Sequence, residues 1–385
     1  DKTVTTDTLY NGDNIVVTSS DENKKISYEI YSQLCKKDIL NSYQDEMSDT
    51  KISYNINAYG ENKKYEYIYD LSGNITEIKL DGNRIYEYAY DVHGRLVKEL
   101  DYVNSTGCVY GYTSTGNVVA KHLKKINSDG SLTNIQDIKY SYENGDWADQ
   151  LTKYGNQKIT YDSVGNPVKY HDGKKFEWIR GRELSKIILS DDSDVTYEYN
   201  QNGLRTHKET NITSTDYEWD EKKLIRETVT YKLSGRKYDI WYYYDGNGDI
   251  AGFEYNEISE MNQELNRKSI YYEKNMQGDV MGLIDSTGAK IASYAYDAWG
   301  NVVDTVCYEK NEIPYALNHI TYRGYYFDNE SGFYYLQSRY YDAEVGRFIN
   351  ADDVKYIGAN ENRWSYNLYM YCEGNPIIVN EETGN

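Results

Sequence analysis

Apolar and polar positions alternate along most of the chain, and tyrosine occupies many of the apolar positions. The segment KKYEYIYD places Tyr65, Tyr67 and Tyr69 on one face, and RIYEYAYD repeats the arrangement over residues 86–90. A second alternating run, NITEIKL, follows the first after a short Gly-containing stretch. Two such runs joined by a Gly-containing turn predict an antiparallel β-hairpin. Because a lone hairpin is marginally stable, we expect the hairpins to stack into a continuous sheet.

The turns between these runs repeat the motif Tyr-Asp-x-x-Gly. Tyr69 and Tyr90 are 21 residues apart, and a looser copy opens at Tyr112, a period that suits two strands and two turns. The Asp side chain can hydrogen-bond the turn backbone, and Gly supplies the positive φ of a tight turn. The residues expected to form the repeat turns are Tyr69, Asp70 and Gly73; Tyr90, Asp91 and Gly94; Tyr161, Asp162 and Gly165; Tyr244, Asp245 and Gly248; and Tyr296, Asp297 and Gly300.

The composition indicates a folded chain whose core is made of tyrosine. Its 385 residues include 46 Tyr but only 5 Phe, and the mean hydropathy is −0.83. Low hydropathy is typical of disorder, but each aromatic ring can bury about 150–250 Å². Tyrosines in phase on repeated hairpins favour cross-strand packing pairs. The alternative is that the rings form platforms that stack on sugars.

Charge and cysteine content exclude several classes of protein. The 62 acidic and 42 basic side chains give a net charge of −20, which speaks against nucleic acid and anionic membranes as partners. No apolar run approaches the roughly 18 residues of a membrane span. The chain begins at Asp1 rather than Met, which indicates a fragment or a processed form. Four widely spaced cysteines predict neither a zinc site nor a disulfide framework.

Apart from the C-terminal segment discussed below, the sequence contains no motif typical of an enzyme. We expect no metal and no cofactor. The segment DGNGD at 245–249 resembles part of a calcium loop, but Ile250 and Asn256 stand where an EF-hand needs Gly and Glu. The five histidines are scattered and show no metal-binding spacing. There is no GxSxG elbow and no phosphate-binding Gly-rich loop.

The last third of the chain carries the most specific signal. The stretch YRGYYFDNESGFYYLQSRYYDAEVGRFINADD, residues 322–353, is very similar to the core motif that closes the repeat arrays of RHS (rearrangement hot spot) proteins. Residues 146–184 and 277–302 resemble the YD repeats of the same family, which is related to teneurin-like and insecticidal toxin-complex C proteins. The resemblance covers about residues 60 to 385.

The resemblance implies an all-β fold in which repeated antiparallel hairpins wind into a spiral sheet or part of a hollow β-shell. The core motif would close the shell as a plug. We therefore expect an N-terminal β segment that weakly matches the repeats at 1–60, a repeat shell at 61–310, and the core motif with a cleavage-like element at 311–385. In the plug, Arg339 and Arg347 are available to pair with acidic neighbours, and the expected role of Arg339 is structural.

In cleaving members of the family, the chain is cut just past the core motif in an aspartic-type reaction. One of two adjacent carboxyls holds a proton while the other activates water. The resemblance assigns this role to Asp352, with Asp353 beside it and Arg347 nearby, and to Glu381 in NEETGN, with the cut after Asn385. The family has Asp where this chain has Glu381, and Pro at the next position. The alternative is that the three acids are solvated turn residues.

Three functions follow from these expectations. The leading one is a structural shell segment of a secreted or cell-surface protein that encapsulates and helps deliver a toxin domain encoded downstream in the same polypeptide. The second is a surface adhesin whose exposed tyrosines bind a glycan or a protein receptor. The third is the intramolecular self-cleavage, which is compatible with the first.

Overall fold

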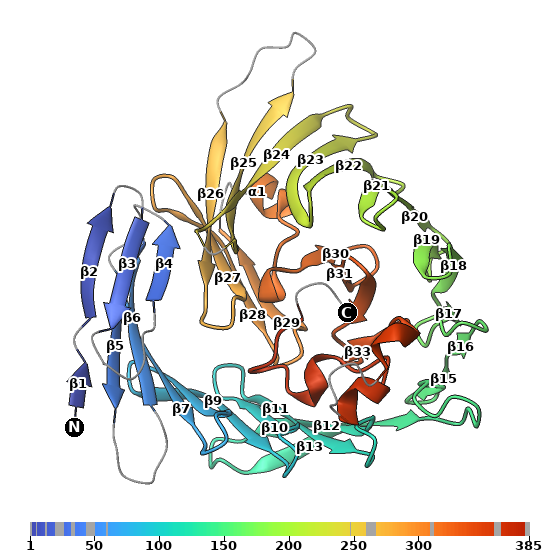
Figure 1. Cartoon of the computed structure of the whole chain (residues 1–385), viewed down its shortest axis with the longest axis horizontal. Helices are drawn as coiled ribbons and strands as arrows, with labels where there is room; N and C mark the ends of the chain where they lie inside the picture. The colour runs from blue at the N-terminus through green and yellow to red at the C-terminus, as the bar shows by residue number, and fades with distance from the viewer. Residues whose placement is uncertain are drawn as a thin grey trace.

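The computed structural model is almost entirely β-sheet, and the sheet forms a curved wall around the C-terminal part of the chain (Figure 1). The structure describes the backbone of residues 2–4, 6–11, 14–19, 27–31, 35–43, 51–58, 61–246, 248–258, 267–308, 312–357 and 363–381. Side chains are described within these ranges from residue 64 onward, with 363 and 365 excepted.

The first part of the wall is a 12-stranded sheet in which the strands after β1 follow chain order. Its strands are β1 (Lys2–Val4), β5 (Cys35–Tyr43), β6 (Lys51–Ala58), β7 (Glu61–Tyr69), β8 (Ile75–Leu80), β9 (Asn83–Tyr90), β10 (Leu96–Asp101), β11 (Thr106–Tyr112), β12 (Val118–Ile126), β13 (Leu132–Ser141), β14 (Lys153–Tyr154) and β15 (Gln157–Lys158). A separate three-stranded sheet consists of β2 (Thr6–Asn11), β3 (Asn14–Ser19) and β4 (Ser27–Tyr31).

The second part of the wall is a 14-stranded sheet in which consecutive strands pair antiparallel. Its strands are β16 (Thr160–Tyr161), β17 (Pro167–Lys169), β18 (Lys175–Ile179), β19 (Glu183–Ile188), β20 (Asp194–Tyr199), β21 (Arg205–Glu209), β22 (Thr213–Asp220), β23 (Lys223–Tyr231), β24 (Lys237–Tyr244), β25 (Ile250–Ile258), β26 (Lys268–Lys274), β27 (Val280–Asp285), β28 (Lys290–Tyr296) and β29 (Val302–Cys307).

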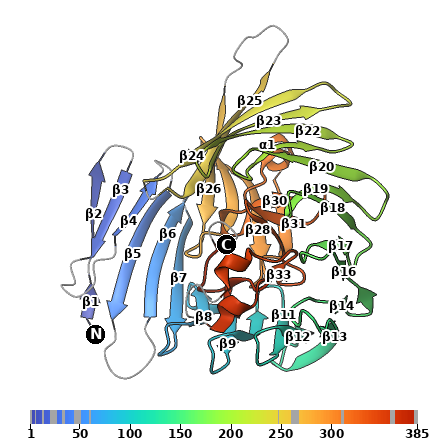
Figure 2. The ribbon, with the colours of Figure 1, turned by 45° about the vertical axis from the view of Figure 1, so that its right-hand side comes forward.

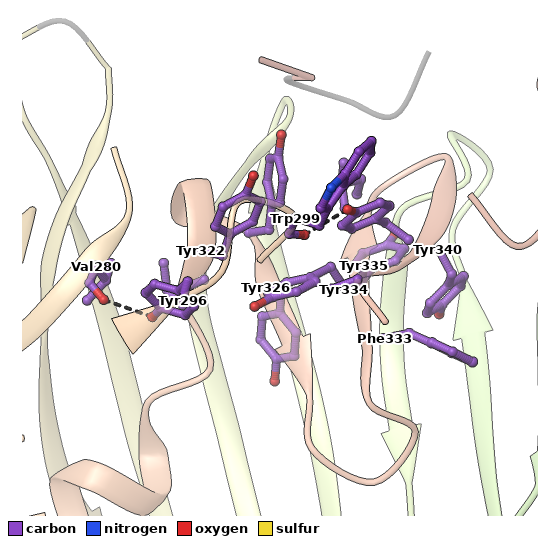
Figure 3. Packing of buried hydrophobic residues seen from close by; sticks show 14 of the residues in the cluster. Val280, Tyr296, Trp299, Tyr322, Tyr326, Phe333, Tyr334, Tyr335 and Tyr340 are labelled. Carbon is purple, nitrogen blue, oxygen red and sulfur yellow. Dashed lines mark hydrogen bonds between the residues drawn. The ribbon is translucent and has the colours of Figure 1, made fainter. Parts of the chain in front are cut away.

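Several tyrosine hydroxyls bond to the backbone of a strand that begins after an earlier turn. The Tyr90 hydroxyl donates to the carbonyl oxygen of Ile75 at 2.7 Å, and the Tyr296 hydroxyl donates to that of Val280 at 2.8 Å (Figure 3). The same bond is made by Tyr112 to Leu96, Tyr142 to Val118, Tyr199 to Leu184, and Tyr244 to Leu224. Each ring is thus packed in the sheet while its polar end keeps a partner, which explains how tyrosine can build the core.

The last repeat turn of the second sheet contacts the middle of the first sheet. The backbone N–H of Ala298, in the last repeat turn, donates to Glu99 Oε2 on β10 at 2.7 Å. Beside this contact, the rings of Tyr110 and Trp299 meet edge to face with their centroids 5.7 Å apart. The wall therefore closes on itself around the interior.

Residues 312–357 and 363–381 lie inside this wall, and we call them the plug (Figures 1 and 2). Its elements are α1 (Glu312–Leu317), η1 (Tyr322–Gly324), β30 (Tyr326–Asp328), β31 (Phe333–Leu336), β32 (Arg339–Asp342), β33 (Arg347–Phe348), η2 (Val354–Tyr356), η3 (Arg363–Tyr366) and η4 (Cys372–Gly374), of which the four strands form one sheet. Tyr334, Tyr341 and Tyr371 are almost fully buried, and the last two stack with a centroid distance of 3.9 Å. One hydrophobic core runs from wall to plug (Figure 3).

Within the described ranges, the helices are too short to cross a bilayer.

Candidate functional site

Asp352 and Arg339 form an ion pair inside the plug. Arg339 begins β32, and Asp352 follows β33; the distance from Nη2 to Oδ2 is 3.0 Å, and both side chains are less than a tenth exposed. Arg339 Nη1 also donates to the carbonyl oxygen of Leu368 at 3.0 Å. Burial lowers the pKa of Arg339 to about 10, although the Asp352 carboxylate acts in the opposite direction. The guanidinium therefore stays charged at neutral pH and remains a counter-ion for the carboxylate.

Glu381 lies within electrostatic range of this pair. Its backbone N–H donates to the Tyr325 hydroxyl at 3.2 Å, and its carboxyl accepts a hydrogen bond from the backbone of Cys372. Burial raises the pKa of Glu381 to about 7; the charge of Arg339 opposes this shift and the charge of Asp352 adds to it. A large fraction of Glu381 is therefore protonated at neutral pH.

The two carboxyls are suited to opposite roles in proton transfer. Asp352 has an arginine counter-ion, whereas Glu381 keeps its proton close to neutral pH. Acid and base roles in hydrolysis are commonly divided between two carboxyl groups in such different environments. Asp352 can accept a proton from water, and Glu381 can donate one to a leaving group.

Asp353, the next residue along, has a different environment. Its side chain caps η2 by accepting from the backbone N–H of Lys355, and it pairs with Arg182 at 3.0 Å. The hydrogen bond from Lys355 lowers the pKa of Asp353, and the side chain is about a third exposed. Asp353 is thus a capping acid at the surface of the plug.

Arg347 contacts the wall instead of the two carboxyls. Its Nη1 donates to the Tyr142 hydroxyl at 2.8 Å, and its Nη2 donates to the carbonyl oxygen of Asp149 at 2.6 Å. The guanidinium also lies 5.0 Å from the centroid of the Tyr369 ring. Arg347 therefore ties the plug to the segment that follows β13. The proposed cleavage position, Asn385, lies outside the described residues.

The repeat turns share one hydrogen-bond geometry. Asp70 Oδ1 accepts from the backbone N–H groups of Ser72 and Asn74, both at 2.9 Å, while Gly73 has a φ of 85°. The same two bonds are made by Asp91, Asp162 and Asp297, and Asp245 accepts from the N–H of Asp249. Gly94, Gly165, Gly248 and Gly300 have φ between 80° and 92°. These turns are tight because Asp fixes the backbone and Gly takes the left-handed conformation.

In several turns the residue that follows the glycine contacts the plug. The repeat pattern alone did not indicate these contacts. The side-chain oxygen of Asn74 accepts from Asn375 Nδ2 at 3.0 Å, and that of Asn117 accepts from Asn367 Nδ2 at 2.8 Å. The Asn301 amide donates to the carbonyl oxygen of Ala343 at 2.8 Å. The row of turns therefore holds the plug by amide contacts.

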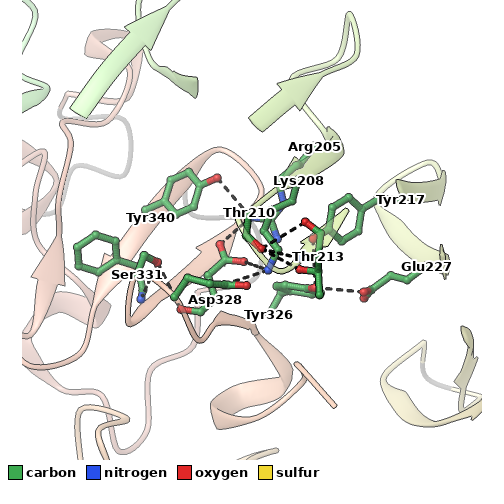
Figure 4. A network of polar contacts seen from close by, with 12 residues as sticks. Arg205, Lys208, Thr210, Thr213, Tyr217, Glu227, Tyr326, Asp328, Ser331 and Tyr340 are labelled. Carbon is green, nitrogen blue, oxygen red and sulfur yellow. Dashed lines mark hydrogen bonds and ion pairs between the residues drawn. The ribbon is translucent and has the colours of Figure 1, made fainter. Parts of the chain in front are cut away.

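A second set of residues that the sequence analysis did not single out joins wall and plug through buried charges (Figure 4). Arg205 of β21 pairs with Asp328 of β30 at 2.6 Å, and Lys208 lies 3.1 Å from the other carboxylate oxygen. The rings around the Arg205 guanidinium, with centroids 4.4–5.2 Å away, are those of Tyr197, Tyr217, Tyr326 and Tyr335. Aromatic faces stabilise a buried cation that water cannot reach.

Metal binding finds no support in the side chains that the structure describes, because no three of their His, Cys, Asp or Glu groups gather as ligands.

Comparison with known proteins finds sequence relatives in Bacillus. No family model matches it. It is 31% identical over 288 residues to the tRNA3(Ser)-specific nuclease WapA of Bacillus spizizenii and 29% identical over 289 residues to the tRNA nuclease WapA of Bacillus subtilis, and each alignment covers 74% of the chain. The chain spans only 11% of the length of either relative.

Solved structures of the toxin complex TcdB2-TccC3 share the fold. The crystal structure of TcdB2-TccC3-TEV superposes with a TM-score of 0.69, and that of TcdB2-TccC3 with 0.66, each at 15% identity. Both cover 97% of this chain and 20% of the other. The chain therefore has the RHS-like β-shell fold that the sequence predicts, with repeated antiparallel hairpins closed by a plug.

Proposed function

We propose that the chain is the wall and plug of a larger shell that encloses a cargo domain of the same polypeptide and helps to deliver it. The observation that carries the proposal is the position of the plug: the wall surrounds its described residues (Figure 1), and the last of them, Glu381, contacts Tyr325 within the plug. A continuation of the chain would start from this interior. A cargo held there cannot reach its substrate until the shell opens.

The comparisons support a toxic cargo. The Bacillus relatives carry the names of tRNA nucleases and are about nine times longer than the region that they share with this chain. In this proposal the shell corresponds to residues 61–310, the preceding segment at 1–60 joins it, and residues 311–385 form the core that presents the cargo. A protein of this kind would act outside the cell that makes it, either secreted or at the cell surface.

Within the plug, we propose that Asp352 and Glu381 cut the chain after Asn385. Asp352 takes a proton from water while the water oxygen forms a bond to the scissile carbonyl carbon. Glu381 donates its proton to the amide nitrogen as the C–N bond breaks. One water molecule is consumed, and the products are a carboxyl group and an amine. The buried Arg339 keeps the Asp352 carboxylate in place throughout.

The intact mass of the chain, expressed with the polypeptide that naturally follows residue 385, tests both parts. We expect two species, one matching residues 1–385 and one matching the downstream piece, that elute together from a sizing column. Co-elution with protection of the downstream piece from protease supports enclosure. A single uncut mass contradicts self-cleavage, whereas two pieces that separate contradict enclosure.

An adhesin that binds a glycan or a protein receptor is the alternative, and it needs an exposed aromatic surface. Among the tyrosines whose side chains the structure describes, the strongly exposed ones are Tyr308 and Tyr366. These two belong to separate segments, one after β29 and one in η3. The described surface therefore favours the shell over an aromatic binding face.

A further inference from the structure

A wall residue, Arg182, reaches the carboxyl pair of the plug. It belongs to the turn between β18 and β19, about 170 residues before Asp352 in the sequence. Its Nη2 lies 3.0 Å from Asp353 Oδ2, and its Nη1 donates to the carbonyl oxygen of Ala351 at 3.3 Å. The same Nη1 is 3.9 Å from Asp352 Oδ1. Arg182 therefore contacts three consecutive residues of the segment that carries the candidate base.

The two oxygens of Asp352 face cations from different parts of the molecule. Oδ2 pairs with Arg339, which is in the plug, and Oδ1 faces Arg182, which is in the wall. The backbone N–H of Asp353 also donates to Oδ1 at 2.6 Å. The other titratable groups around the Asp352 carboxylate are Asp353 and Glu381. Orientation of the carboxylate thus depends on the wall being in place beside the plug.

The turn that carries Arg182 is itself held by a repeat turn. Arg180 and Gly181 both have positive φ, at 45° and 89°, so the backbone makes a sharp reversal there. The fully buried side chain of Asn166 donates to the carbonyl oxygen of Gly181 at 2.7 Å and also to Asp162 Oδ2 at 2.9 Å. A rigid repeat turn therefore fixes the turn from which the Arg182 side chain extends.

Arg182 also lines a cleft of about 570 Å³ between wall and plug. Its lining includes Arg182 and Glu183 of the wall and Gln337 and Ser338 of the plug. Gln337 Nε2 crosses the boundary and donates to the carbonyl oxygen of Lys222 at 2.9 Å. Because residues of both the wall and the plug line this cleft, it forms only when the two are docked.

We propose that Arg182 is a positioning residue that couples self-cleavage to closure of the wall around the plug. The inference rests on the proposed self-cleavage and adds its regulation: an undocked plug lacks the second cation on Asp352 and cuts slowly. Arg182 takes no part in bond making. It orients the carboxylate that accepts the proton, and misplacement of such a group by about 1 Å can lower a rate roughly a hundredfold.

The test compares variants of the full chain with its natural continuation, made by cell-free synthesis, pulse-labelled, and chased in buffers across a range of pH. We expect Arg182→Gln to slow cutting about ten- to a hundredfold. Arg182→Lys keeps a cation and should restore most of the rate.

Arg180→Gln is the matched control. Arg180 lies in the same turn, but its contacts are with Glu183 at 3.2 Å and the carbonyl oxygen of Asn200 at 3.3 Å, both in the wall. It should cut at the wild-type rate, and thermal melts should show that every variant is folded. A folded Arg182→Gln that cuts at the wild-type rate overturns the inference and leaves self-cleavage intact. A wild-type chain that is never cut overturns self-cleavage itself, and the inference with it.

Discussion

Arg205 of the wall and Asp328 of the plug form an ion pair in which neither side chain is exposed, with 2.6 Å between Nη1 and Oδ2. Burial raises the free energy of both charges, and their mutual attraction together with Lys208 offsets that cost. The attraction of Arg205 and Lys208 keeps the pKa of Asp328 below its usual range even though burial acts strongly in the opposite direction. The pair joins two segments that are more than a hundred residues apart, so it stabilises the docked plug specifically.

We expect Asp328→Asn to lower the free energy of unfolding by about 3–5 kcal/mol, because Arg205 is left buried without its counter-ion. Urea denaturation followed by tyrosine fluorescence measures this. Glu143→Gln is the control, since Glu143 makes an ion pair of similar length, 2.8 Å, with Lys153 at the surface. That substitution should leave the urea midpoint unchanged. Equal midpoints for the two variants would contradict a role of the buried pair in docking.

Glycines of the repeat turns should differ in their tolerance of a side chain. Gly73 and Gly165 have nearly the same φ, 85° and 90°, but a Cβ at Gly73 meets no atom within 4 Å. A Cβ at Gly165 would lie 2.7 Å from the Tyr369 hydroxyl and 2.8 Å from the Trp147 ring. Gly73→Ala should cost about 1 kcal/mol through backbone strain alone. Gly165→Ala should cost about 1–3 kcal/mol more in the same denaturation experiment, because the plug must shift.

The wall could be predicted from sequence because its determinants are local. Alternation around Tyr65 and Tyr67, and the Asp and Gly of each turn, specify hairpins within about 20 residues. Contacts between wall and plug have no such local signal. Asn375 meets Asn74 across 301 positions, and nothing in either segment marks its partner.

The carboxyl pair shows where sequence proximity misleads. Arg347 is closer in sequence to Asp352 than Arg339 is, yet Arg339 makes the ion pair. The reason lies in strand pairing: β32 pairs antiparallel with β33, and Ile349 N–H donates to the carbonyl oxygen of Tyr340 at 3.0 Å. The chain beyond β33 therefore runs back beside the start of β32 and brings Asp352 to Arg339. The family motif identifies the candidate carboxyls, but their ion-pair partners follow only from the register of the hairpin.

Stability of the shell should fall as pH rises from about 4.5 to about 7. Burial raises the pKa of Glu227 to about 7, and the same cause raises the pKa of Glu99 to about 7. In the unfolded chain these carboxyls ionise near pH 4.5. Their contribution to the free energy of unfolding is therefore fully present below that pH, and it is lost as the pH rises to their pKa in the folded state. For the fully buried Glu227 the loss is on the order of 3 kcal/mol.

Urea midpoints measured from pH 4.5 to pH 8 test this dependence. Glu227 accepts from the hydroxyls of Tyr242 at 2.6 Å and of Tyr326 at 3.1 Å, and Gln can accept one of these bonds without ionising. Glu227→Gln should therefore flatten the decline. Glu218→Gln, which alters an exposed carboxyl in the neighbouring strand, should keep the wild-type slope. A wild-type midpoint that rises from pH 5 to pH 7 would contradict the burial of protonated carboxyls.

Removal of either carboxyl of the plug should slow self-cleavage, for different reasons. Asp352→Asn removes the group that takes a proton from water, and Glu381→Gln removes the group that donates one, so each should slow cutting by about 10²–10⁴-fold. Glu344→Gln is the control because Glu344 is an exposed carboxyl of the same core motif.

In the wild type the rate should decline above about pH 7, since Glu381 loses the proton that it donates. Mass spectrometry of the chain with its natural continuation measures the uncut fraction over time. Two results together would exclude Glu381 from the mechanism: a wild-type rate that keeps rising well above pH 7, and a Glu381→Gln variant that is cut as fast as the wild type. Asp352 would then be the one carboxyl that takes part in cutting.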